Sequence, residues 1–156
     1  MTLDDDIANL SRIPLFAFFE PSALRMLALS AEARLLRGGD VLFRRGETSD
    51  GGYVLTIGSI ALDPYDERGP RSLIIRPWTL IGETALVAPS TRRAAAVARE
   101  PATVLKILRP TFHVILEQHP ATAARVRDFF RRRLVHFIRE VGVDESTSDI
   151  DPRPLR

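Results

Sequence analysis

The feature that most constrains this fold is a row of short apolar segments separated by glycine-rich turns. The apolar segments lie at 41–43, 53–55 and 60–62, and the turns contain Gly38, Gly39, Gly46, Gly51 and Gly52. Such spacing is typical of short antiparallel strands joined by tight turns. We therefore expect this region to form part of a β-barrel or jelly roll.

The segments on either side of this region have the periodicity of helices. Pro21 suits a first helical turn, and the leucines that follow it predict a helix over about 21–36. Two further helices are predicted, over 111–118 and 121–141, and Pro120 separates them. The last helix has one apolar stripe at helical spacing, formed by Val126, Phe130, Leu134, Phe137, Ile138 and Val141.

The chain has 156 residues, which suits one domain with its own core. We expect a single α+β domain over 1–143: an antiparallel β-barrel or jelly roll of about eight strands at about 37–108, with an N-terminal helix and two C-terminal helices. The residues at 144–156 are polar and contain proline, so a disordered tail is predicted there.

Composition excludes several classes of function. Cysteine is absent, which rules out disulfides, iron–sulfur clusters and thiol catalysis. The acidic start "MTLDDDIANL" is not a signal peptide, and no apolar run approaches the thickness of a bilayer, so we expect a cytoplasmic protein without a membrane span. No histidine and glutamate cluster falls on the predicted strands, and no catalytic triad is visible. We therefore expect no metal, no prosthetic group and no enzymatic activity.

The segment "IGETALVAPSTRRAAAV", residues 81–97, combines one glutamate, Glu83, and a pair of arginines, Arg92 and Arg93, with small and apolar residues. Gly82 permits a close backbone approach, and the residues from Glu83 to Leu86 suit a single helical turn whose free N–H groups could face a phosphate. If a strand starts at Arg92, that arginine shares one face with alanines 94, 96 and 98. A lone guanidinium there could bind a phosphate through two hydrogen bonds, while Glu83 accepts bonds from sugar hydroxyls. The pattern predicts a sugar phosphate ligand with a flat base.

This segment resembles the phosphate-binding cassette of the cyclic nucleotide-binding domain family, whose usual form is Phe-Gly-Glu-x-Ala-Leu, a short loop, and Arg-x-Ala-Thr-Val. The segments "GGDVLFRRGE" and "YVLTIGSIAL" are also similar to that family, and the likeness extends over about 10–141. The resemblance implies binding of cyclic AMP or, less favoured, cyclic GMP. The ligand-binding residues it implies are Gly82, Glu83, Thr84, Ala85, Arg92, Arg93 and Ala94, with Phe130 and Phe137 as a possible lid.

Some positions depart from the family pattern or leave a choice open. Arg93 also fits the cassette if one residue is inserted, but Arg92 needs no gap and is preferred as the phosphate ligand. Ala95 replaces the usual threonine of that strand. Members that select cyclic GMP usually carry threonine directly after the arginine, and Arg93 in that position favours cyclic AMP. Trp78 and Thr79 stand where a glycine often precedes the cassette.

The function predicted from these residues is a sensor that binds a cyclic nucleotide and regulates an effector protein by moving its last helix. The alternative is a scaffold of the same fold that has lost the nucleotide, with Glu83 and Arg92 as a structural ion pair. Phe130 and Phe137 could pack in the core or cover the base. Only 15 residues follow Val141, too few for a helix-turn-helix unit, so no DNA binding is expected. Arg131, Arg132 and Arg133 suit a solvated helix face or, alternatively, a basic patch that contacts an anionic membrane or a nucleic acid.

Overall fold

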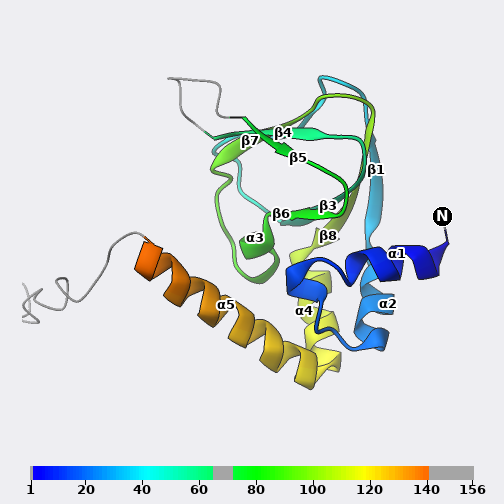
Figure 1. Ribbon diagram of the computed structural model, residues 1–156, viewed down its shortest axis with the longest axis vertical. Helices are drawn as coiled ribbons and strands as arrows, with labels where there is room; N and C mark the ends of the chain where they lie inside the picture. Colours follow the sequence, from blue (N-terminus) through cyan, green and yellow to red (C-terminus); the bar gives the residue numbers. More distant parts are fainter. Residues whose placement is uncertain (1, 65–71, 141–156) are drawn as a thin grey trace, which may run out of the picture.

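The computed structural model describes residues 2–64 and 72–140, and it contains two four-stranded antiparallel sheets (Figure 1). The strands are β1 (Glu32–Leu36), β2 (Val41–Phe43), β3 (Gly51–Ile57), β4 (Ile60–Pro64), β5 (Leu73–Ile75), β6 (Thr79–Ile81), β7 (Ala94–Ala98) and β8 (Ala102–Leu108). One sheet has the order β1-β8-β3-β6 and the other the order β2-β7-β4-β5. The predicted α+β class with eight antiparallel strands is confirmed, while the predicted tail at 144–156 lies outside the described residues.

The helices pack at one end of this roll (Figure 1). They are α1 (Leu3–Leu10), the 3-10 helix η1 (Pro14–Phe16), α2 (Pro21–Ser30), α3 (Glu83–Val87), α4 (Arg109–Gln118) and α5 (Pro120–Glu140). The sequence analysis did not predict α1, which begins with a capping box between Thr2 and Asp5. The apolar segment after α1 packs in the core, where Leu15 and Phe16 are fully buried.

The first predicted helix was too long. Instead of continuing to residue 36, α2 ends at Ser30, and residues 32–36 form β1. The Ser30 hydroxyl donates to the Met26 carbonyl oxygen at 2.7 Å, and Ala31 is extended. Pairing with β8 then takes over, from Glu32 opposite Lys106 to Leu36 opposite Ala102. Helix propensity over "EARLL" is therefore overridden by hydrogen bonds to a strand some 70 residues away, which local sequence does not reveal.

Two apolar cores follow from the alternation of side chains across β3 and β8. Tyr53, Leu55 and Val104 point into the roll, whereas Val54 and Ile107 pack against the helices. The helical core also contains a group of aromatic rings in contact with one another, formed by Phe16, Phe19 and Phe112. Because β3 and β8 contribute side chains to both cores, one sheet packs against the interior of the roll on one face and against the helices on the other.

The start of α5 is fixed to the N-terminal helices by two buried polar residues. His119 Nδ1 lies 2.8 Å from the Ile115 carbonyl oxygen, and His119 Nε2 lies 3.0 Å from the Ser22 hydroxyl. Thr122 is fully buried and bonds to Glu20 through its hydroxyl. Beyond this anchor α5 runs past α3, as Figure 1 shows. The first turn of α5 is thus held by hydrogen bonds to the start of α2, and the preceding His119 also bonds back to α4.

We expect His119→Ala to lower the free energy of unfolding by about 2–4 kcal/mol, because it removes two hydrogen bonds and leaves a cavity at the α4–α5 corner. Urea denaturation followed by circular dichroism measures this. His113→Ala is the matched control on the exposed side of α4 and should change stability by less than about 0.5 kcal/mol. Equal effects of the two substitutions would contradict the anchoring role of His119.

Candidate functional site

The predicted cassette begins at a glycine whose backbone conformation requires glycine. Gly82 follows β6 with φ 81° and ψ 46°, in the left-handed region, and α3 starts directly after it. A Cβ atom at this position would lie 2.5 Å from Arg92 Nη1. Gly82 therefore serves two purposes: it lets the chain turn into α3, and it leaves space for the Arg92 guanidinium.

Arg92 is buried inside the roll, with 8% of its surface exposed. Its Nη2 atom donates to the Gly51 carbonyl oxygen at 2.6 Å, and its Cζ atom lies 4.4 Å from the centroid of the Phe43 ring. Among the described residues no carboxylate lies within ion-pair distance of this guanidinium. Burial lowers the pKa of Arg92, although a guanidinium stays charged at neutral pH. The site thus contains a buried cation that only neutral groups contact closely.

The two candidate arginines occupy opposite environments. Arg92 points inward, whereas Arg93 is exposed. The Arg92 backbone is fixed on both sides, since its N–H donates to the Glu47 carbonyl and its carbonyl accepts from the Gly46 N–H, each at 2.8 Å. The expected strand starts later than Arg92, because β7 begins at Ala94. The assignment of Arg92 as the phosphate ligand stays a prediction, and this inward geometry favours it.

The other predicted binding residues line the same turn and strand. Thr84 is exposed, Ala85 is buried, and Ala94 is half-buried at the start of β7. The Ala85 carbonyl oxygen accepts a hydrogen bond from Arg109 Nε at 2.9 Å. Sequence reasoning missed Arg109, because the residue is separated from α3 by the whole of β7 and β8 and no motif marks it.

Glu83 has a protein partner that the sequence analysis did not foresee. Its Oε1 atom lies 3.1 Å from Nη1 of Arg133 on α5, and Cζ of Arg133 lies 4.9 Å from the Phe129 ring centroid. About 29% of the Glu83 side chain and 53% of the Arg133 side chain remain exposed. The only signal in the sequence was the run of three arginines at 131–133, which does not indicate which of them reaches the cassette.

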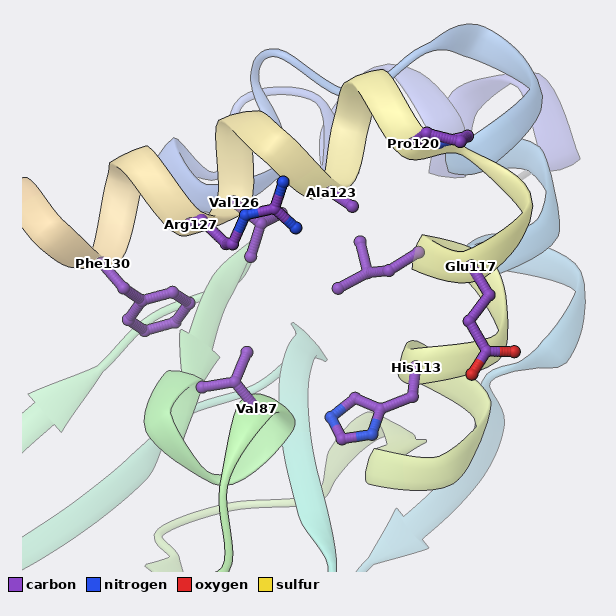
Figure 2. A pocket seen from close by; sticks show the side chains of 9 residues that line it. Val87, His113, Glu117, Pro120, Ala123, Val126, Arg127 and Phe130 are labelled. Atoms are coloured by element: carbon purple, nitrogen blue, oxygen red, sulfur yellow. The ribbon is translucent and has the colours of Figure 1, made fainter.

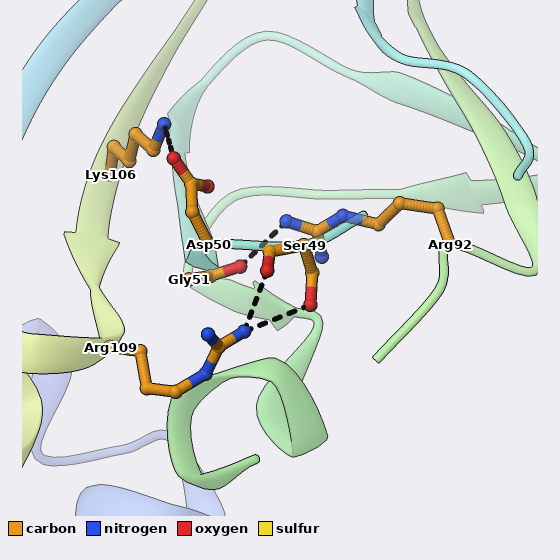
Figure 3. A network of polar contacts seen from close by, with 6 residues as sticks. All are labelled: Ser49, Asp50, Gly51, Arg92, Lys106 and Arg109. Carbon is orange, nitrogen blue, oxygen red and sulfur yellow. Dashed lines mark hydrogen bonds and ion pairs between the residues drawn. The ribbon is translucent and has the colours of Figure 1, made fainter. Parts of the chain in front are cut away.

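Three cations hold the segment from Ser49 to Gly51, as Figure 3 shows. Arg92 bonds to the Gly51 carbonyl, and Lys106 Nζ lies 2.8 Å from Asp50 Oδ2. Arg109 Nη2 donates to the Ser49 carbonyl oxygen at 2.7 Å and lies 3.1 Å from the Ser49 hydroxyl. Because the cations come from three different parts of the chain, they connect the cassette region, β8 and the start of α4 through one short segment.

An apolar groove of about 680 Å³ lies between α4, α5 and the end of α3. In Figure 2, Val87 of α3 and Phe130 of α5 point toward the open space between them. The lining residues are Val87, His113, Leu116, Glu117, Pro120, Ala123, Val126, Arg127 and Phe130. The possible lid residue Phe130 is thus half-buried at this groove, and the side chain of Phe137 lies outside the described part of the chain.

Within 2–64 and 72–140, no group of three potential metal-ligating side chains comes together. None of the helices in these ranges has the combined length and hydrophobicity that crossing a membrane requires.

A roll that encloses a guanidinium and closes it with a glycine-initiated helical turn defines a binding domain for a small anionic ligand. The family model described as "Cyclic nucleotide-binding domain" matches residues 33–119. The chain belongs to the cyclic nucleotide-binding domain family, a family of regulatory binding domains.

Solved structures of similar proteins agree with this assignment. The chain is 40% identical to a cyclic nucleotide-binding-like protein from Brucella abortus, with a TM-score of 0.66, covering 73% of this chain and 99% of that one. It is 29% identical to the N-terminal domain of a transcriptional regulator from Streptomyces coelicolor, with a TM-score of 0.77, covering 85% and 94% of the two chains.

A curated relative is considerably longer. The acetyltransferase Pat of Mycolicibacterium smegmatis is 30% identical over 143 residues, which are 91% of this chain and 43% of that protein. This chain therefore spans less than half the length of that relative.

We expect Gly82→Ala to destabilise the domain more than Gly39→Ala. Both glycines have positive φ, but a Cβ atom at Gly39 meets nothing within 4 Å, whereas one at Gly82 meets Arg92. The Gly39 variant should lose about 1 kcal/mol from conformation alone. The Gly82 variant should lose about 2–4 kcal/mol, because strain and displacement of a packed side chain add to that loss.

Urea denaturation of both variants measures the difference. In an Arg92→Ala background the excess loss at Gly82 should disappear, since the clashing guanidinium is gone. An excess that persists in that background would mean that Arg92 is not the group that requires glycine at this position.

Proposed function

We propose that this domain is a sensor for cyclic AMP that signals to an effector protein by rearranging α5. The observation that carries the proposal is the buried Arg92 guanidinium, which has no carboxylate partner among the described residues and lies against Gly82 of the cassette. A buried cation without a counter-ion is costly, and a bound cyclic phosphate would offset that cost.

In this proposal the phosphate binds between Arg92 and the start of α3. The Arg92 Nη1 atom lies beside Gly82, which precedes the first residue of α3. At this N-terminal end, the backbone N–H groups lack partners within the helix. Charge-assisted hydrogen bonds from a guanidinium to a phosphate are short and directional. The rings of Phe43 and Tyr53 hold the guanidinium in the roll without neutralising it, which keeps the charge available for an anion.

Glu83 would accept a hydrogen bond from the ribose 2′-hydroxyl. In the structure this carboxylate contacts Arg133, so ribose binding would compete with an ion pair that joins the cassette to α5. A ligand shifts a conformational equilibrium only through different affinities for the two states, and this competition provides such a difference. The ion pair is partly exposed and therefore weak, on the order of 1 kcal/mol or less, which suits a reversible contact.

Movement of α5 would follow from the way the helix is held. His119 and Thr122 fix its start, whereas its later turns contact α3 through Arg133 and border the groove beneath Phe130. Release of Glu83 by Arg133 would allow α5 to pivot about its fixed first turn. Closure of the groove against Val87 would bury apolar surface and stabilise the ligand-bound arrangement.

The preference for cyclic AMP comes from the family resemblance. Arg93 follows Arg92 at the position where members selective for cyclic GMP usually carry threonine, and its side chain is exposed. Arg93 therefore provides no hydroxyl group that could bond to a guanine base.

A second function is favoured by one observation. Glu83 already has a partner in Arg133, and Arg92 already donates to Gly51, so the residues could serve the fold without a nucleotide. The domain would then be a scaffold of the same fold for protein interactions. Calorimetry with cyclic AMP and cyclic GMP separates the two, since a scaffold gives no binding heat with either nucleotide.

Arg92→Ala should weaken cyclic AMP binding about 10- to 150-fold, because it removes a charge-assisted interaction worth about 1.5–3 kcal/mol. Titration calorimetry measures the dissociation constant. Arg93→Ala is the matched control and should change binding less than about twofold, since exposed charges contribute little. If the two variants exchanged effects, the phosphate ligand would be Arg93 and the assignment would be wrong by one residue.

Arg133→Gln should strengthen cyclic AMP binding about two- to fivefold, because Glu83 no longer has to give up an ion pair of at most about 1 kcal/mol. Arg131→Gln serves as the control, since Arg131 pairs with Asp128 on the exposed surface of α5. Weaker binding by the Arg133 variant would show that this arginine helps to hold the ligand and does not compete with it.

A further inference from the structure

We propose that Lys106 sets the affinity of the site for a phosphodiester anion by holding the Asp50 carboxylate away from Arg92. Lys106 is thus a positioning residue, since it acts on Arg92 through Asp50. The inference rests on the proposed binding of a cyclic nucleotide at Arg92 and assigns one further determinant of that binding.

Lys106 is the only lysine of the chain, and it faces the interior of the roll from β8. Only 8% of its side chain is exposed, and its Nζ atom lies 2.8 Å from Asp50 Oδ2. Asp50 is 60% exposed, so this ion pair joins a buried cation to a carboxylate near the surface. A buried ammonium without a counter-ion is strongly disfavoured. Lys106 therefore holds Asp50 in a defined place.

Arg92 is the second cation with which the Asp50 carboxylate could form an ion pair. Asp50 precedes Gly51, whose carbonyl accepts the Arg92 hydrogen bond. Arg92 Cζ lies 5.5 Å from the Tyr53 ring centroid, and Lys106 Nζ lies 5.7 Å from the same centroid. In Figure 3 Asp50 lies between Lys106 and the guanidinium of Arg92, and its only ion pair among the described residues is with Lys106.

The charges agree with this geometry. The pKa of Asp50 is held below its usual value mainly by the hydrogen bond from Lys106, and the charge of Arg92 adds to that effect. Asp50 therefore stays ionised at neutral pH and interacts with both cations, while its carboxylate forms an ion pair with Lys106.

This choice of partner matters because a carboxylate on Arg92 would compete with a phosphate. A carboxylate and a phosphodiester each form paired hydrogen bonds with a guanidinium. If Asp50 contacted Arg92, an incoming phosphate would first have to displace an anion that is covalently part of the protein. With Asp50 held by Lys106, the guanidinium of Arg92 bonds to the Gly51 carbonyl and lies over aromatic rings, which are weaker partners than an anion.

Arg109 keeps the neighbouring backbone in place. It donates to the carbonyl oxygen and hydroxyl of Ser49, directly before Asp50. These bonds hold the backbone directly before Asp50, so in this proposal the exchange between Lys106 and Arg92 is a change in the Asp50 side chain. The effect concerns the phosphate and not the base, so it should be equal for cyclic AMP and cyclic GMP.

The test is titration calorimetry with cyclic AMP on the purified chain. Lys106→Met should weaken binding about tenfold, the scale of one charge-assisted hydrogen bond, because Asp50 then turns to Arg92. The double variant Lys106→Met with Asp50→Asn should return to within about threefold of the unmodified chain, since the competing carboxylate is gone. Lys106→Arg keeps the ion pair and should bind normally, as should the remote control Asp4→Asn.

Normal binding by Lys106→Met would overturn the inference. A double variant that stays as weak as Lys106→Met would also overturn it, because Lys106 would then act only through the stability of the roll. If Lys106→Met does not fold, Asp50→Asn alone decides: it should bind at least as tightly as the unmodified chain, and weaker binding would refute the proposal.

The proposed binding of a cyclic nucleotide and the role of Lys106 can be tested separately. If the unmodified chain binds neither cyclic nucleotide, the proposed function is wrong, and the position of Asp50 is decided in the ligand-free proteins by ¹⁵N NMR of the Arg92 side chain. Lys106→Met should shift the Arg92 Nε–Hε signal, and adding Asp50→Asn should return it. An unchanged signal would overturn the inference.

Discussion

The burial of one guanidinium group governs how this domain is built. Arg92 needs a neighbour without a side chain, which Gly82 supplies, and a carbonyl acceptor, which Gly51 supplies. Two aromatic rings, Phe43 and Tyr53, cover the rest of the group inside the roll. A guanidinium remains charged when buried, so the group depends on these polar and aromatic neighbours. The fold of the two sheets thus keeps a charge in the interior.

That charge is connected to the helices by a few polar contacts and one shared sheet. Arg109 joins the cassette carbonyl of Ala85 to Ser49 from the first residue of α4. Arg133 reaches back from α5 to Glu83. Phe130 of α5 borders the apolar groove, and His119 bonds to Ser22 at the start of the same helix. The cassette and α5 are therefore joined by side chains that contact one another.

Much of the fold and of the site could be predicted from local sequence. Short apolar segments between glycines predicted the antiparallel roll, and Pro120 predicted the boundary between the last two helices. The spacing of Gly82, Glu83 and Arg92 indicated a phosphate-binding segment, because the chemistry of that segment is concentrated in about ten consecutive residues. Alternation along the expected strand also placed Arg92 on one face with alanines 94, 96 and 98, although β7 itself begins at Ala94. Each of these features depends on neighbours in the chain, which sequence patterns record.

Tertiary structure decided the features that depend on distant pairing. Residues 32–36 became a strand because β8 offered hydrogen bonds, although their sequence favours a helix. Glu83 found Arg133, and Asp50 was paired with Lys106 instead of Arg92, because helix and strand positions bring these groups within reach. No local pattern distinguishes Arg133 from Arg131, or one carboxylate partner from another. The sequence by itself thus determined which chemical groups the site contains, whereas packing decided which of them are paired, since ion pairs depend on distances that only the folded chain defines.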